Sequence, residues 1–252
     1  MKIAAQLYTV REFTKSNDEV RRTLARVREI GYEGVQISGF QAYDPKNIVE
    51  GLRENGLEVC ATHTPLDRIL KETEKVIEEH KLFKAKYVGL GYFRGEAVSD
   101  YQKLLDDLAL ALEKIHAVGL RFLYHNHEHE LKKYGGIRPL DVMRDSTKSG
   151  TFDFLPDLYW LQTAGCSPEA FLHEYAGRTP VVHFKDMRVA PESGKSNMAE
   201  IFEGNMDYIT LYRVCDRLGV EWAAVEQDVC DGNPFDSLKL SFENMKARGL
   251  IV

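Results

Sequence analysis

Short apolar runs alternate with helical patterns along the whole chain, and this alternation restricts the fold more than any other feature of the sequence. Eight runs have the length and composition of strands. They are Lys2–Tyr8, Gly34–Ser38, Glu58–His63, Tyr87–Gly91, Arg121–Asn126, Thr151–Leu155, Val181–Lys185 and Trp222–Glu226. Strands that alternate with helices form parallel sheets. Eight such units in 252 residues predict an α/β fold closed into a (β/α)8 barrel.

Glycines mark the points at which helical patterns give way to strands. Gly31, Gly56, Gly119 and Gly219 each follow a helical pattern and precede an apolar run. Glycine adopts the left-handed conformation of a helix C-terminus without a Cβ penalty, so these positions are expected to end helices. The sixth strand is the least regular, because TFDFLPD contains a proline, which is tolerated at a strand end.

Amphipathic periodicity predicts four helices between these strands. The first, Asn17–Ile30, carries apolar residues along one stripe and follows Ser16, a residue type that caps helix N-termini. The other three are Asp67–Phe83, Asp100–Val118 and Ser237–Arg248. Because no low-complexity linker separates the elements, one domain over residues 1–252 is expected.

The composition argues against several classes of protein. The net charge of −6 disfavours nucleic-acid binders, which usually present a basic face. No run of about 18 apolar residues suggests a membrane span, and the N-terminal apolar stretch is too short for a signal peptide. The four cysteines form no C-x-x-C pair, so reduced thiols and a cytoplasmic location are expected. Cys60 and Cys215 lie in apolar patterns and are predicted core residues. No G-x-G-x-x-G follows the first strand, which disfavours dinucleotide binding.

Polar side chains gather at the carboxyl ends of the predicted strands, where (β/α)8 barrels place their active sites. Histidines, carboxylates and one lysine converge at the ends of the last four strands. These are His125, His127 and Glu130 after strand five, Asp157 after strand six, His183 and Lys185 in strand seven, and Glu226 in strand eight. Carboxylates and imidazoles suit Mn²⁺, Zn²⁺, Co²⁺ or Mg²⁺, so a divalent-metal site is predicted.

Individual members of this group also have structural explanations. A histidine such as His63 is more often hydrogen-bonded within the fold than bound to a ligand. Asp157 could cap the following turn, and Lys185 could form an ion pair at the barrel mouth. The convergence of four strands favours the metal site, because buried charges are costly unless they are paired or bound to metal.

Seven motifs follow one another over nearly the whole chain. They are QLYTVRE, GYEGVQISG, YHNHEHEL, DLYWLQTAG, VVHFKDM, EGNMDY and VEQD. Together they resemble the sugar phosphate isomerase/epimerase family, the xylose-isomerase-like TIM barrels. The resemblance implies a divalent metal held by Asp157, His183, Glu226 and an acidic residue of strand five. Either Glu130 supplies that carboxylate from beyond the strand, which we favour, or His125 or His127 replaces it.

The resemblance also implies chemistry at a carbon next to a carbonyl. Relatives that isomerise ketoses often use a glutamate pair from strands five and eight, and here the strand-five member is displaced or replaced. A histidine, His125 or His127, is therefore the expected base, with Glu226 near the proton path. Lys185 is expected to stabilise the negative charge of an enediolate.

The implied substrate is a sugar, keto-sugar or related polyol, with or without a phosphate. Tyr8, Tyr92 and Trp160 suit the apolar face of a sugar ring, and Gln36 and His63 complete the predicted substrate site. Return of the proton gives isomerisation or epimerisation. Loss of a β-leaving group from the same intermediate gives dehydratase or lyase chemistry, which is the main alternative.

Two other functions are disfavoured. Metal-dependent abasic-site endonucleases share this barrel, but phosphodiester hydrolysis on DNA calls for a basic groove that the acidic balance opposes. A non-catalytic sugar-binding protein does not require the set Asp157, His183 and Glu226. The polar segment Arg188–Phe202 is expected to be a loop that serves as a lid or joins a homo-oligomer contact. Neither nucleic acid nor membrane is an expected partner.

Overall fold

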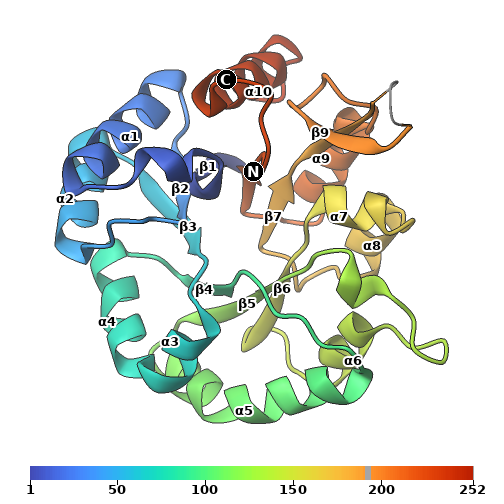
Figure 1. Cartoon of the computed structure of the whole chain (residues 1–252). Coiled ribbons are helices and arrows are strands. Elements are labelled where there is room, and N and C mark those ends of the chain that lie inside the picture. Colours follow the sequence, from blue (N-terminus) through green and yellow to red (C-terminus); the bar gives the residue numbers. More distant parts are fainter. Residues whose placement is uncertain (191–193, 252) are drawn as a thin grey trace.

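The computed structural model describes residues 1–190 and 194–251, and its strands form a ring inside a shell of helices (Figure 1). Every predicted strand is present. They are β1 (Lys2–Gln6), β2 (Gly34–Ile37), β3 (Glu58–Thr62), β4 (Tyr87–Leu90), β5 (Arg121–His125), β6 (Phe152–Leu155), β7 (Val181–Phe184) and β10 (Trp222–Val225).

Backbone hydrogen bonds divide the ring into two arcs of parallel strands, β3-β2-β1-β10-β7 and β4-β5-β6. The first strand pairs with the last, so the two ends of the chain meet within the longer arc. The arcs join at two seams. At the seam between β3 and β4, the Thr64 amide donates to the Gly89 carbonyl oxygen at 2.7 Å. At the seam between β6 and β7, the His183 amide donates to the Pro156 carbonyl oxygen at 2.9 Å. This arrangement is that of a TIM barrel.

Helices cover the outside of the ring. They are α1 (Asn17–Ile30), α2 (Pro45–Asn55), α3 (Leu66–Lys71), α4 (Thr73–Phe83), α5 (Val98–Ala117), α6 (Pro139–Asp145), α7 (Leu158–Thr163), α8 (Pro168–Glu174), α9 (Tyr208–Arg217) and α10 (Pro234–Ala247), with 3-10 turns η1 (Leu7–Phe13) and η2 (His129–Leu131). The prediction for α1 is confirmed, because the Ser16 side chain caps it by accepting the Glu19 amide. The C-terminal helix α10 lies next to α1 (Figure 1).

Two predicted boundaries are wrong for local reasons. The helix expected over Asp67–Phe83 is two helices, because Glu72 has φ −127° and ψ 34°. The Thr73 hydroxyl at this break donates to the Ile69 carbonyl, a bond that competes with a regular helix. The first strand ends before Tyr8, because the Gln6 side chain accepts the Tyr8 amide and starts η1.

The segment Arg188–Phe202, predicted to be a loop, includes parts of two paired strands. Strands β8 (Asp186–Val189) and β9 (Ser196–Ala199) pair antiparallel, and residues 191–193 lie outside the described residues. The Asp186 carboxylate holds the hairpin to the segment that follows. It accepts the backbone amides of Met187, Phe202, Gly204 and Met206.

The buried apolar residues form two clusters. The larger lies between strands and helices and includes Cys215. The smaller consists of strand residues alone and fills the inside of the ring. Its members are Ala4, Cys60, Ala61, Tyr87, Leu123, Leu155, Val181, Trp222 and Ala224. The burial of Cys60 and Cys215 confirms their predicted place in the core. Over the described ranges, no helix combines the length and apolar character needed to cross a membrane.

The seam between β3 and β4 requires a residue without a side chain. A Cβ added to Gly89 would lie 2.1 Å from the Thr62 carbonyl oxygen. We predict that Gly89→Ala lowers the free energy of unfolding by about 1–3 kcal/mol, as overpacking of a core does. Urea denaturation measures this change. The control is Gly232→Ala, because a Cβ there meets nothing within 4 Å. Equal effects of the two substitutions would contradict a tightly packed seam.

Candidate active site

The polar residues at the barrel mouth lie on the same inward-facing side of the strands as the smaller apolar cluster. Side chains of a strand point to alternate faces. Val181 of the inner cluster is therefore followed on the same face by His183 and Lys185, and Ala224 by Glu226. The same alternation that fills the ring with small apolar residues thus brings ionisable groups together at its carboxyl end.

Three carboxylates surround the ammonium group of Lys185, which is 1% exposed. Its Nζ lies 2.9 Å from Asp157 Oδ2, 2.9 Å from Glu226 Oε2 and 3.0 Å from Asp228 Oδ2. Among the described residues, only the contact with Asp228 is aligned as a hydrogen bond. The two oxygens of Asp157 and Glu226 therefore keep their capacity to bind another positive group.

His183 faces the same two carboxylates. Its Nδ1 lies 2.9 Å from Glu226 Oε2 and 3.5 Å from Asp157 Oδ2. Its Nε2 lies 2.7 Å from the Gln36 amide oxygen. Since that oxygen accepts, Nε2 carries a proton, and Nδ1 is the ring nitrogen that faces the two carboxylates. Nδ1 has no hydrogen-bond partner within the described part of the chain.

These side chains fit a divalent cation. Asp157, His183 and Glu226 are all buried, and one ligand atom of each lies within 4.8 Å of the others. Two carboxylates and one imidazole are a suitable donor set for Mn²⁺, Co²⁺ or Zn²⁺. A hydrogen bond such as that from His183 to Gln36 commonly orients a metal-bound histidine. The Lys185 ammonium contacts the same two carboxylate oxygens and would compete with the ion.

The charges of the cluster depend on one another. Burial opposes the charge of Lys185, but Asp157, Glu226 and Asp228 raise the lysine pKa well above its ordinary value. Burial likewise opposes ionisation of Glu226, but Lys185 and His183 hold its pKa well below the usual range. Burial and the nearby Glu226 raise the pKa of Asp228 to about 7. At neutral pH, Asp228 is therefore the carboxyl group of this cluster that can gain or lose a proton.

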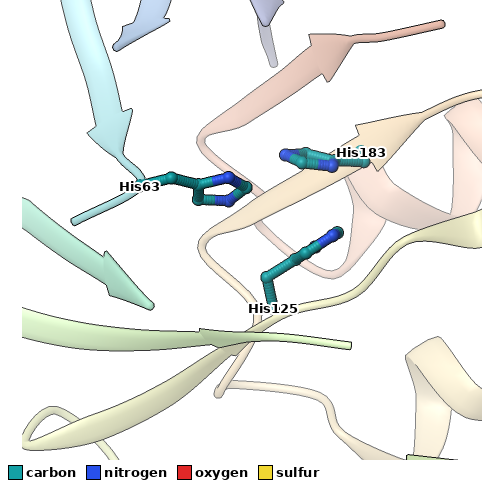
Figure 2. A group of neighbouring side chains, drawn as sticks. All are labelled: His63, His125 and His183. Carbon is teal, nitrogen blue, oxygen red and sulfur yellow. The ribbon is translucent and has the colours of Figure 1, made fainter. Parts of the chain in front are cut away.

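Three histidines from different strands point toward one another beside this cluster: His63 after β3, His125 in β5 and His183 in β7 (Figure 2). The ring centroids of His125 and His183 are 4.4 Å apart, and those of His63 and His125 are 5.0 Å apart. Burial and the neighbouring His183 lower the pKa of His63 to about 3 and that of His125 well below its usual value. Both rings are therefore neutral at pH 7, each with one unprotonated nitrogen.

The structure places Glu130 in a separate group. Its carboxylate accepts hydrogen bonds from the Tyr124 hydroxyl and the His127 backbone amide, both at 2.9 Å. His129 Nε2 lies 3.2 Å from Glu130 Oε1. His127, His129 and Glu130 form a second set whose ligand atoms lie within 4.8 Å of one another. The fourth ligand of the Asp157 site stays a prediction, with His125, which lies beside His183, and His127 as the other candidates.

Three of the predicted substrate residues line a cavity at the barrel mouth, and the other two contact the ion cluster. Tyr8, His63 and Tyr92 line one cavity of about 390 Å³ at the mouth of the barrel. Gln36 is buried beneath this level and bonds to His183. The Trp160 ring lies 5.5 Å from Lys185 Nζ, so it borders the ion cluster.

Asp228 is the site residue to which the sequence analysis gave no role. It lies two positions after Glu226, and both carboxylates contact Lys185. The signal was present in the motif VEQD, because alternation puts its two acidic residues on one face when the strand conformation continues.

Comparisons with known proteins agree with this fold. A family model described as "Xylose isomerase-like TIM barrel" matches residues 24–247. Among curated proteins, the chain is similar to an inosose dehydratase from Geobacillus kaustophilus (strain HTA426), with 21% identity over 194 residues. This match covers 66% of the chain and 62% of that protein, which is less than two thirds of the relative's length.

Two solved structures extend the likeness over the whole chain. A sugar phosphate isomerase/epimerase from Parabacteroides distasonis ATCC 8503 has a TM-score of 0.82 and 18% identity, covering 100% of this chain and 95% of that chain. A probable 3-DHS dehydratase from Bacillus anthracis has a TM-score of 0.76 and 16% identity, covering 98% and 99% respectively. At these identities the likeness shows a common fold.

The end of β3, next to His63, is hydrogen-bonded to a buried histidine of α4. His80 Nε2 lies 2.9 Å from the Thr62 hydroxyl, which lies 3.0 Å from that of Thr64. The other ring nitrogen, Nδ1, lies 2.7 Å from the Val76 carbonyl oxygen. Burial lowers the pKa of His80 to about 4. A proton added to this ring in the folded state is therefore unfavourable.

We predict that His80 makes the protein less stable in acid. Between pH 6.5 and about 4 the unfolded chain takes up a proton at this ring and the folded chain does not, so the free energy of unfolding falls as pH falls. His80→Gln should reduce this slope by up to one proton, about 1.4 kcal/mol per pH unit. Urea denaturation at several pH values measures it. His116→Gln, at an exposed position of α5, is the control; an unchanged slope in His80→Gln would contradict the assignment.

Proposed function

Because the chain belongs to the xylose isomerase-like TIM barrel family, we propose that it is a metal-dependent enzyme that isomerises or epimerises a sugar, keto-sugar or related polyol. The family match confirms the resemblance that the strand-end motifs predicted. The observation that carries the proposal is the buried set Asp157, His183 and Glu226, whose ligand atoms converge within 4.8 Å of one another beside His63 and His125. The proposal treats residues 1–252 as one (β/α)8 domain.

The acidic set is the proposed metal site. Asp157, His183 and Glu226 would hold Mn²⁺, Zn²⁺, Co²⁺ or Mg²⁺, with Glu130, His125 or His127 as fourth ligand. A divalent ion bound there supplies Lewis-acid stabilisation to a substrate oxygen that gains negative charge. Lys185, whose ammonium is charged at neutral pH, adds a second positive group for that oxygen.

A neutral histidine is the proposed base. His125 Nδ1 lies 3.3 Å from the Leu155 carbonyl oxygen, so it donates there and leaves the lone pair on Nε2. This nitrogen would take the proton from the carbon next to the carbonyl and later return it. His127, whose pKa burial lowers, is the second candidate. Glu226 and Asp228 lie near this path and could relay the proton.

The mouth cavity supports a sugar as substrate. Tyr8 and Tyr92 are 37% and 57% exposed, and both line the cavity. The Arg11 guanidinium lies 4.1 Å from the Tyr8 ring centroid and limits the ring's movement. Exposed aromatic faces of this kind bind the C–H face of a pyranose, and Trp160 beside Lys185 would add a third.

Dehydration is the second candidate, favoured by the similarity to an inosose dehydratase. It would share the proton removal and differ in the loss of a hydroxyl group from the neighbouring carbon. A phosphodiesterase and a non-catalytic sugar-binding protein are lesser alternatives. The cytoplasmic location, and a lid or homo-oligomer contact formed by the segment Arg188–Phe202, remain predictions.

We predict that the purified protein binds about one equivalent of divalent metal per chain and that Asp157→Ala and His183→Ala abolish this binding. Lys185→Met should bind the metal about tenfold more tightly, because it removes the competing ammonium and leaves the carboxylates with less positive charge. Elemental analysis after dialysis and a chelator competition measure these effects. Asp67→Ala, at an exposed carboxylate, is the control. A protein without metal under every loading condition would favour the sugar-binding alternative.

The proton transfer has its own test. We predict that the metal-loaded protein exchanges the hydrogen next to the carbonyl of a keto-sugar or inosose with deuterium from solvent. His125→Gln should slow this exchange by about 10²–10⁴-fold, the usual contribution of a general base. Nuclear magnetic resonance follows both exchange and the product, so release of water identifies dehydration. If His125→Gln exchanged deuterium at the parental rate, His127 would be assigned as the base instead of His125.

A further inference from the structure

A second cavity lies beside the mouth cavity, and the proposed chemistry leaves it without a role. Its volume is about 460 Å³, and it lies between the ends of β2 and β3 and the helices α3 and α4. Five residues line both cavities: Ser38, Gly39, His63, Thr64 and Pro65. His63, which also contacts the histidine cluster, therefore forms part of a wall common to the reaction site and both cavities.

Charged groups in this second cavity balance one another. Arg68 Nη2 lies 2.8 Å from Glu79 Oε1, and its Nε lies 3.3 Å from Glu72 Oε2. Lys75 Nζ lies 3.4 Å from the same oxygen of Glu72. The Glu79 carboxylate is buried and also accepts a hydrogen bond from the Tyr43 hydroxyl at 2.8 Å. Two cations and two anions leave no net charge, so the cavity suits a neutral ligand better than a phosphate.

The lining of the mouth cavity also favours a neutral ligand over a phosphate. The residues that line it include no lysine, arginine, aspartate or glutamate. Neither cavity offers the cluster of cationic donors that holds a phosphate group.

The second cavity combines apolar and hydrogen-bonding surfaces. Phe40, Tyr43 and Pro65 supply apolar area, and the Arg68 guanidinium lies 5.3 Å from the Tyr43 ring centroid. Carbohydrate rings present a C–H face to such surfaces and hydroxyl groups to fixed polar side chains. Its volume lies within the range of about 300–1,000 Å³ that small-molecule pockets occupy, so it is large enough for a ligand group of its own.

We propose that this cavity binds the second ring of a neutral glycoside whose reacting ring lies in the mouth cavity. The substrate would then be a two-ring sugar without phosphate. This inference rests on the proposed function, because it assigns the reacting ring to the site of Asp157, His183 and Glu226. Tyr43 would contact the face of the second ring, and Lys75 and Glu72 its hydroxyl groups.

The test compares one-ring and two-ring sugars on the full chain by ligand-observed nuclear magnetic resonance. The probes are glucose, galactose, cellobiose, lactose, maltose and glucose 6-phosphate. We predict that at least one disaccharide binds about tenfold more tightly than its component monosaccharides and glucose 6-phosphate. Tyr43→Ala and Lys75→Ala should each remove most of this advantage. Lys71→Ala is the matched control, because this exposed lysine does not line the cavity.

Each contrary outcome overturns the inference. It fails if no disaccharide binds more tightly than its monosaccharides, or if glucose 6-phosphate binds most tightly. It also fails if folded Lys75→Ala, changed only at an exposed side chain, binds the disaccharide as the parent does. Metal content measured in parallel separates the two proposals. Loss of the disaccharide preference with metal binding intact contradicts this subsite, and absence of metal with the preference intact contradicts the proposed chemistry.

Discussion

The buried ion cluster around Lys185 connects the candidate site with one of the two seams of the barrel. Asp157 follows β6, Lys185 follows β7 and Glu226 follows β10, so their contacts tie three strands. Between β6 and β7 the only ladder pairing among the described residues is an isolated bridge from Asp157 to His183. Removing one partner from a buried ion cluster is costly, because it leaves a charge uncompensated. The same carboxylates that would bind metal therefore also close the ring.

The charge balance of this cluster favours the binding of a further cation, as the proposed metal site requires. Asp157, Glu226 and Asp228 carry up to three negative charges, and Lys185 carries one positive charge. Burial makes this excess of negative charge unfavourable. Burial and the nearby Glu226 raise the pKa of Asp228 to about 7. Burial opposes a positive charge on His183, but the neighbouring carboxylates raise its pKa. Protons and a divalent ion are two ways to supply the same missing positive charge. Metal binding is therefore expected to release protons from this cluster.

Local patterns predicted the strands and most of the site, whereas side chains beyond the strand ends could not be placed. Alternation along β7 and β10 is a property of the strand itself, so His183 and Glu226 follow from it. Glu130 comes after β5 has ended, and the turn η2 directs its carboxylate to the Tyr124 hydroxyl and the His127 amide. The hairpin β8–β9 depends on Asp186 bonding to amides up to 20 residues away, which no local pattern reveals.

The motifs that carry the family resemblance serve two different purposes. In VVHFKDM, His183 and Lys185 face the ion cluster, whereas Asp186 accepts backbone amides of the segment EGNMDY. Tyr208 of that segment accepts the Lys185 amide at 2.8 Å. A chain that had lost its chemistry would still need Asp186, Gly204 and Tyr208 to fold, so these motifs are evidence for the barrel. The proposal of an enzyme rests instead on Asp157, His183 and Glu226, three buried ligand-type side chains that converge at the barrel mouth.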